Sequence, residues 1–455
     1  MGSIISRDPN VVSQWLVDKV KRLHEPFFKA LLDTRLPTQH AFTLLRSCMV
    51  PRMNYWSRIT PPVVFQPAAE TFDRLVVDTF CKRLKLPALT DVARSMLTLP
   101  VRVGGFGLTS LQNVNPVAWY CGFAHAFSLI RPSIVGPVPA LSNDIPFIST
   151  LSTCFDYFKR FSFPRGSPAC VTLGQFLEHY EHKRCPAGSQ RLIMAVIYNT
   201  SADSILREFP HNSADRARLL SIKAPYSGSW LTTPPIDPLF TLDDHQFSLA
   251  TRLRLGTALY DDILHCACGT SLKEFPHHFL SCTNLCGKFI QRHDRLVLTL
   301  TRVARTCGVF AQVEPRIDEK DKSRGDGHLF FHSQGGIFDV MVVHPTCPSR
   351  VKSAQSQLGA AKNGETERIT HYDQRLRDQG LRFFPAVLES YGAFGVRCKD
   401  LVAKIQEEGN LNGIKVIRGL KISTYLMKAL TFSLQSGNGL LAIEGSKRSR
   451  KRLKY

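Results

Sequence analysis

The sequence predicts a multidomain α+β protein with a helical N-terminal half, a small metal knuckle, an αβββαβ core, and a C-terminal helix with a basic tail. Three observations support this prediction. The chain has 455 residues, 44% of them hydrophobic, and is long enough to bury several cores. Its apolar residues recur at helical spacing near the N-terminus and in short strand-like runs after about residue 300. Between these regions, four cysteines crowd into the stretch from Cys266 to Cys286.

The predicted helical region covers residues 1–130. Its apolar side chains recur three and four residues apart, as on the buried face of a helix. The first stripe comprises Val12, Trp15, Leu16, Val20 and Leu23, and later stripes cover 41–48 and 72–80. Residues 131–240 are predicted to be a helical linker region, because their two ends, 131–147 and 225–238, are rich in Pro and Ser.

Residues 241–287 are predicted to combine a helix, capped by Asp243, with a zinc knuckle. Three thiolates and one imidazole suit Zn²⁺, which closes a structural site with four soft ligands. We therefore expect one structural zinc ion, bound by four residues that lie close together in the sequence: Cys266, Cys268, His277 and Cys282. His265, His278 and Cys286 are rival ligands, and a cluster of unrelated buried thiols is the alternative interpretation.

Residues 288–400 are predicted to form the αβββαβ core. A helix over about 288–306 precedes three strand-like runs, and a polar helix over about 351–379 precedes a buried strand. The strands are expected at 309–313, 327–332, 337–343 and 382–388. Gly335-Gly336 is typical of a hairpin turn between the second and third of these strands. Residues 401–455 are expected to form the C-terminal helix and the basic tail.

Two aspartates mark a second candidate site, since Asp326 begins one strand and Asp339 lies inside the next. Carboxylates on adjacent strands can hold Mg²⁺, which prefers oxygen ligands and activates water for attack on a phosphate. Glu314 is a candidate third carboxylate. The alternative is that these aspartates are solvated or cap turns. An ideal turn at Gly335-Gly336 pairs Asp339 with about Phe330 and leaves Asp326 four residues further on, roughly 13 Å away, so a bulge or a curved entry is required.

The charge balance predicts a polyanionic partner. Lys and Arg number 58 against 37 Asp and Glu, which gives a formal charge of +21. Six of these positive charges fall in the last ten residues, as in a solvated tail, a nuclear-localisation signal or a nucleic-acid arm. No apolar run is long enough for a transmembrane helix and no signal peptide is visible, so we expect a reducing compartment. Gly2 fits a short N-myristoylation pattern, and a lipid-anchored protein is a third interpretation.

Several segments resemble one family of mobile-element proteins in content and order. GSIISRDPNVVSQWLVDKV looks like the segment after a reverse-transcriptase palm, and LLRSCMVPRMNYWSRITPP, LPVRVGGFGLTS and SGSWLTTPP look like the thumb and the segments downstream. HCACGTSLKEFPHHFLSC looks like the family's Cys-Cys-His-Cys knuckle, and Arg292-His293-Asp294 and Glu314-Pro315 look like the motifs that open its endonuclease. RGDGHLFFHSQGGIFDVMVVHP and LRFFPAVLESYGAFG resemble the nuclease core. The chain thus resembles the C-terminal half of non-LTR retrotransposon polyproteins that carry a restriction-enzyme-like endonuclease.

The resemblance implies a reverse-transcriptase thumb in residues 1–130, the zinc knuckle, and an endonuclease core in residues 288–400. It implies a metal-dependent enzyme that nicks DNA to prime reverse transcription of element RNA, with Mg²⁺ or Mn²⁺ on Asp326 and Asp339. The expected partners are target DNA and element RNA, without a membrane or a small-molecule substrate, and the expected location is the nucleus, with the cytoplasm as the alternative. Since no palm precedes Met1, no polymerase activity is expected from this chain alone.

The chain departs from the family pattern near the expected catalytic centre. Gly325 stands where the family usually has Pro, and Met341 stands where many related nucleases have Lys. The family's helical lysine matches Arg368, and arginine can hold a phosphate but cannot act as a base. Lys362, one to two turns earlier, is a candidate substitute. The rival hypothesis is a DNA- or RNA-binding remnant whose nuclease core has decayed.

Overall fold

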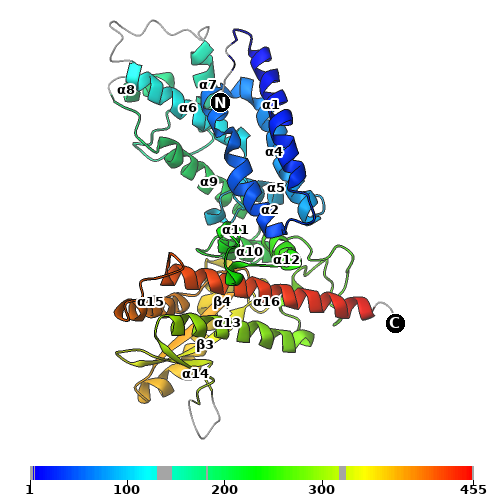
Figure 1. Ribbon diagram of the computed structural model, residues 1–455, viewed down its shortest axis with the longest axis vertical. Helices are drawn as coiled ribbons and strands as arrows, with labels where there is room; N and C mark the ends of the chain where they lie inside the picture. The colour runs from blue at the N-terminus through cyan, green and yellow to red at the C-terminus, as the bar shows by residue number, and fades with distance from the viewer. Residues whose placement is uncertain (1–3, 5, 131–145, 181–182, 317–323, 453–455) are drawn as a thin grey trace. The chain divides into compact units, whose positions relative to one another are not determined.

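The computed structural model describes residue 4 and residues 6–130, 146–180, 183–316 and 324–452 (Figure 1). The chain divides into two compact units. The N-terminal unit consists of Met1–Leu36, Ala41–Pro100 and Gly105–Ile205, and the C-terminal unit consists of Pro37–His40, Val101–Gly104 and Leu206–Tyr455. The five-part division expected from the sequence has no boundary here, because Ile205 and Leu206 lie inside its 131–240 part. None of the described helices is long and apolar enough to cross a membrane.

The described part of the N-terminal unit is helical, as the sequence predicts for residues 1–130. Asp8 caps α1 by accepting a hydrogen bond from the Asn10 N–H, and Leu16 and Val20 are buried while Leu23 remains 47% exposed. The helices are α1 (Pro9–Ala30), α3 (Asn54–Ile59), α4 (Pro62–Leu84), α5 (Asp91–Thr98), α6 (Leu111–Ile130), α7 (Pro146–Phe158), α8 (Leu173–Tyr180) and most of α9 (Ser189–Arg207). Between α1 and α3 lie α2 (Thr38–Leu44), a π-helical turn (Leu45–Met49) and a 3₁₀ turn (Val50–Met53).

The two predicted linkers have different outcomes. The first, 131–147, lies almost entirely outside the described residues. The second, 225–238, was wrongly predicted as a linker: it contains the short helix α11 (Ser229–Thr232), and Trp230 and Leu231 are each only 2% exposed. Its Pro and Ser residues shape turns around this buried anchor, and Trp230 packs edge-on against Phe247.

The C-terminal unit contains the predicted αβββαβ order. Its helices are α10 (Ala214–Ile222), α11, α12 (Asp244–Leu255), α13 (Cys286–Thr306), α14 (Gly359–Asp378), α15 (Val396–Leu411) and α16 (Ile422–Arg452). The main sheet has the spatial order β1 (Phe310–Val313), β2 (Gly327–Phe330), β3 (Gly335–Val343) and β4 (Arg382–Glu389), and β5 (Val416–Ile417) and β6 (Leu420–Lys421) form a separate pair. As predicted, Asp243 caps α12, accepting from the Gln246 N–H.

The register of the main sheet corrects the expected hairpin. β1, β2 and β3 are successively antiparallel, whereas β3 and β4 are parallel and joined through α14. Gly335 and Gly336 are the first residues of β3 and pair with Phe330 and Leu329, so they do not form the turn. A Cβ on Gly336 would lie within 2.8 Å of ring atoms of Phe331 and Phe384. Gly336 therefore leaves the space that two aromatic rings occupy. The turn between the strands consists of the residues between Phe330 and Gly335.

The basic C-terminus is a helix rather than a tail as far as Arg452. α16 packs along α13 and α12, and Ser446 and Ser449 are only 2% and 1% exposed (Figure 1). Positively charged residues alternate here with small buried ones, so this segment can pack on one side while Lys447 and Lys451 face solvent. The predicted helix at 351–379 also begins later than expected, because Leu358 has φ 64° and α14 starts at Gly359.

Candidate metal centre and carboxylate pair

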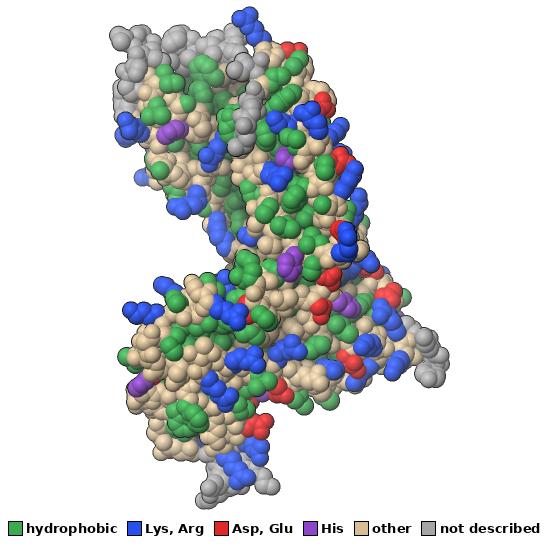
Figure 2. Space-filling model, viewed as in Figure 1, with side chains coloured by type: hydrophobic (Ala, Val, Ile, Leu, Met, Phe, Trp, Pro, Cys, Tyr) green, Lys and Arg blue, Asp and Glu red, His purple; other side chains and the backbone are tan. Residues whose placement is uncertain are grey.

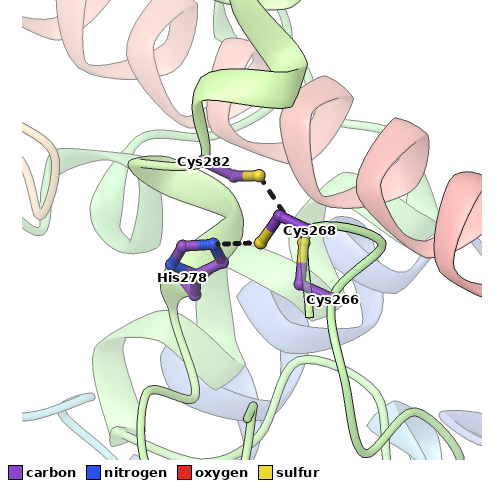
Figure 3. A group of neighbouring side chains, drawn as sticks. All are labelled: Cys266, Cys268, His278 and Cys282. Atoms are coloured by element: carbon purple, nitrogen blue, oxygen red, sulfur yellow. Dashed lines mark hydrogen bonds between the residues drawn. The ribbon is translucent and has the colours of Figure 1, made fainter. Parts of the chain in front are cut away.

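Three thiols and one imidazole converge in the knuckle between α12 and α13. Ligand atoms of Cys266, Cys268, His278 and Cys282 all lie within 4.8 Å of one another. The Cys266 and Cys282 sulfurs are 3.6 Å apart, and the Cys268 sulfur lies 3.1 Å from Nε2 of His278 (Figure 3). Bonds of about 2.3 Å to sulfur and about 2.0 Å to nitrogen place the ligands of tetrahedral zinc at similar separations. The donor set and its spacing therefore fit a metal ion such as zinc.

The predicted ligand His277 was wrong, and its neighbour His278 takes the place. The His277 ring is buried, with Nδ1 2.6 Å from the Tyr391 hydroxyl and Nε2 3.1 Å from the Thr257 carbonyl oxygen. Burial lowers the pKa of His277 to about 4, so the ring is neutral. The two histidines share a turn in which adjacent side chains point apart, and sequence spacing alone does not show which one faces the thiols.

Hydrogen bonds from two directions hold the first cysteine pair. Within the loop, the Cys266 N–H donates to the Thr270 carbonyl, and Gly269 turns the chain at φ 100°. From α16, Arg452 donates to the Ala267 carbonyl at 2.6 Å and the Ser449 hydroxyl accepts from the Ala267 N–H at 3.0 Å. The helix that carries the basic C-terminus therefore supports the knuckle, which has little core of its own.

The remaining rival ligands do not join the cluster. His265 forms a β-bridge with Ser271, and Cys286 is an exposed residue at the start of α13. Within the described part of the chain, the Cys₃His group is the only set of three or more His, Cys, Asp or Glu side chains gathered this closely. Burial opposes ionisation of Cys268, but hydrogen bonds to Thr270, Cys266 and His278 outweigh it and lower the pKa of this thiol to about 6. A thiolate is the form that binds metal.

The two predicted aspartates lie side by side, Asp326 just before β2 and Asp339 within the neighbouring strand β3. The ladder pairs Gly327 with Phe338, and the Asp326 N–H donates to the Phe338 carbonyl at 3.1 Å. The Asp326 carboxylate accepts from the Val340 N–H at 2.5 Å, so it lies across the peptide of Asp339. The gap expected from a turn at Gly335-Gly336 does not exist, because the turn lies earlier in the sequence and shifts the register by several residues.

Asp339 sits in an electrostatically unfavourable position. Its residue is 6% exposed and faces α14, whose Arg368 Nε lies 3.1 Å from Asp339 Oδ2 without forming a well-directed hydrogen bond. Burial, followed by the charge of Asp326, raises the pKa of Asp339 to about 6, and Arg368 and His293 oppose this shift. A buried carboxylate beside a second one, with an oxygen lacking a hydrogen bond, is a common feature of functional sites.

His293 is a member of this group that sequence reasoning did not select. It projects from α13, and its Nε2 lies 2.8 Å from Asp326 Oδ2. The hydrogen bond to Asp326 is the main cause that raises the pKa of His293 to about 9. The preceding residue, Arg292, points the opposite way and donates to Asn438 of α16. The available signal was the Arg292-His293-Asp294 motif, although nothing in it indicated which residue would face the aspartates.

The structure does not bring two other predicted residues to the aspartates. The Glu314 side chain is 68% exposed and pairs with Arg324 at 3.3 Å, although its N–H donates to the Asp326 carbonyl. Lys362 is exposed on α14, six residues before Arg368 and therefore about 120° around the helix from it. Met341 packs under α14, where its sulfur lies close to Gly364. The described group is thus two carboxylates, one histidine and one arginine.

Comparison with known proteins gives a partial similarity. No protein-family model matches the chain. A stretch of 181 residues, 38% of the chain, is 27% identical to the "Retrotransposable element SLACS 132 kDa protein" of Trypanosoma brucei gambiense. The matched stretch spans only 15% of that protein's length. This similarity supports a retrotransposon origin for the chain.

Proposed function

We propose that this chain is part of a non-LTR retrotransposon protein and carries a metal-dependent endonuclease that nicks DNA beside a zinc knuckle. One observation carries the proposal: Asp326 and Asp339, which an ideal turn at Gly335-Gly336 would separate, lie together at the adjacent interior strands β2 and β3, with Arg368 3.1 Å from Asp339. The partial similarity to a retrotransposable element protein points to the same class. The αβββαβ order agrees with the nuclease core that the sequence resembles.

In this proposal each residue of the group has a chemical role. Asp326 and Asp339 would hold Mg²⁺ or Mn²⁺, which lowers the pKa of a bound water and offsets charge on the scissile phosphate. Arg368 remains charged and donates hydrogen bonds to phosphate oxygens, but it cannot accept a proton. His293 orients the Asp326 carboxylate through its 2.8 Å hydrogen bond. Lys362 and Glu314 would act only after a rearrangement that brings them to the aspartates.

The charge distribution supports a nucleic-acid substrate. The chain has a formal charge of +21, and Figure 2 shows Lys and Arg side chains over the visible face of both units, with fewer Asp and Glu among them. Phosphate contacts of this kind give affinity that is independent of base sequence and weakens with salt. The proposed zinc knuckle, which α16 holds in place, adds a rigid element to the C-terminal unit, where the two aspartates also lie.

A plasmid assay tests the proposal. Wild-type protein incubated with supercoiled plasmid and Mg²⁺ or Mn²⁺ should produce open circles, and Asp326→Asn or Asp339→Asn should abolish this conversion. Asp378→Asn, an exposed acid at the end of α14, is the matched control and should nick like wild type.

The second candidate function is a DNA- or RNA-binding protein without catalysis. Arg368 in the position of the family's lysine, and the separation of Glu314 from the aspartates, favour this alternative. If wild type and Asp339→Asn are equally inert while binding plasmid equally well, the nuclease proposal is refuted in favour of the binding protein.

A further inference from the structure

The N-terminal unit contains a cavity of about 780 Å³ that no part of the proposed function uses. Its lining comes from the π-helical and 3₁₀ turns before α3, from one face of α6, and from the start of α9. The size falls within the range of pockets that hold small ligands, about 300–1,000 Å³. The cavity therefore has room for a group as large as a nucleotide.

The charged side chains in this lining are all basic. Arg46, Arg58 and Arg191 line the cavity together with His125, and none of the described lining residues is Asp or Glu. Arg58 and Arg191 are exposed, and Arg58 donates to the Gln190 side chain at 3.0 Å. Three guanidinium groups therefore line one cavity whose described lining holds no carboxylate, and a bound anion would meet only positive charge there.

Arg46 gives the most specific indication of an anion. Its Nε is buried and has no hydrogen-bond partner among the residues that the structure describes. Burial of this guanidinium also lowers its pKa. A buried charged donor without an acceptor costs free energy, and a ligand oxygen would satisfy it. Guanidinium groups match phosphate oxygens in geometry as well as in charge.

The backbone at the start of α9 adds to the positive potential. Gly188, with φ 84°, precedes this 19-residue helix, and Gly188 to Arg191 all line the cavity. The first N–H groups of a helix and its dipole favour an anion at this end. The arginines and the helix start therefore act on the same space.

The rest of the lining combines polar side chains, such as those of Asn54, Thr109 and Gln190, with an apolar part. The apolar part comprises Val50, Pro51, Val114, Ala118, Met194 and Tyr198. A base needs such a surface for stacking and van der Waals contact, whereas a free inorganic anion does not. A duplex presents phosphates on a convex surface with its bases stacked inside, so a concave pocket suits an unpaired nucleotide better.

We infer that this cavity seats one nucleotide of a single-stranded nucleic acid, with its phosphate on Arg46, Arg58 and Arg191 and its base against the apolar lining. The inference rests on the nucleic-acid partner in the proposed function but does not depend on cleavage, since the aspartates lie in the other unit. Either unpaired RNA or unpaired DNA would supply the phosphate and the exposed base that the cavity would bind.

Fluorescence anisotropy on the full-length chain tests the site without added Mg²⁺. The probe is a fluorescein-labelled ten-nucleotide single-stranded RNA, with DNA of the same sequence as a second probe. The double variant Arg58→Gln/Arg191→Gln should weaken binding at least about tenfold, because two charge-assisted hydrogen bonds to phosphate are removed. Its log-log salt slope should become shallower by about 0.7 for each phosphate that the variant no longer neutralises. Arg46→Gln should also weaken binding.

The matched control is Arg74→Gln/Arg165→Gln, which removes the same charge from exposed arginines of the same unit outside the cavity. Equal weakening by the control and the cavity variant would mean that general charge attraction accounts for binding, and would overturn the inference. A nucleoside monophosphate should displace the probe more effectively than inorganic phosphate, and equal displacement would reduce the site to a simple anion site. Plasmid nicking is measured separately, so failure of the nuclease proposal is distinguishable from failure of this one.

Discussion

The structure makes opposite predictions for two adjacent histidines. We expect His278→Ala to weaken zinc binding while leaving the fold of the C-terminal unit in place, and His277→Ala to weaken the fold while leaving zinc bound. The prediction depends on the 3.1 Å separation of His278 Nε2 from the Cys268 sulfur, and on the burial of His277 against Tyr391 and Thr257.

The expected magnitudes follow from these contacts. Structural zinc sites contribute about 10–16 kcal/mol, so one ligand of four is worth about 3 kcal/mol, or roughly a hundredfold in zinc affinity. Loss of His277 leaves the Thr257 carbonyl without its partner and creates a cavity, at a cost of about 3–5 kcal/mol in the free energy of unfolding. Tyr391 keeps its 3.1 Å hydrogen bond to Thr346, which limits this cost.

The assay combines zinc content after dialysis against a competing chelator with thermal unfolding of the same samples. His278→Cys is the rescue variant, because a fourth thiolate is also a good zinc ligand and should restore zinc binding. If His277→Ala loses zinc and His278→Ala retains it, the assignment of ligands from this geometry is refuted.

Three further predictions concern the same unit. The double variant Arg448→Ala/Arg452→Ala should weaken zinc retention, because these side chains donate to the Asn284 and Ala267 carbonyls of the knuckle. The control Lys447→Ala/Lys451→Ala should retain zinc like wild type. Equal zinc retention in the two double variants would contradict a supporting role for α16. Asp339→Asn should raise the melting temperature at pH 7. The pKa of the Asp339 carboxyl rises from 3.8 to about 6 on folding, so its stabilising effect is lost as pH rises through 6, and the ionised carboxylate then costs up to about 3 kcal/mol. A lower melting temperature of the variant would argue against this cost. His293 has its pKa raised from 6.5 to about 9, so its contribution is present below pH 6.5 and is lost as pH rises through 9; His293→Gln should flatten the pH dependence of unfolding in this window, and an unchanged profile would count against the His293 to Asp326 pair.

The sequence alone determined the type and order of most elements. Helical apolar spacing predicted α1 and α4, and the αβββαβ order was visible in the change from three- and four-residue spacing to short β-branched and aromatic runs. These features depend on local patterns, because each element buries one face whichever partner covers it. The knuckle was also local, since three of its four ligands follow from the content of an 18-residue stretch.

Tertiary packing decided the features that depend on which way a side chain points. His278 rather than His277 faces the thiols, because the His277 ring is hydrogen-bonded to the hydroxyl of Tyr391, more than a hundred residues later. Within β3, Gly336 leaves room for the rings of Phe331 and Phe384, and Gly335 lies against His328 and Leu381. This register sets Asp326 beside Asp339. The basic C-terminus is helical because α12 and α13 bury its small residues. Each outcome is set by packing between residues distant in sequence, and local spacing carries no information about such packing.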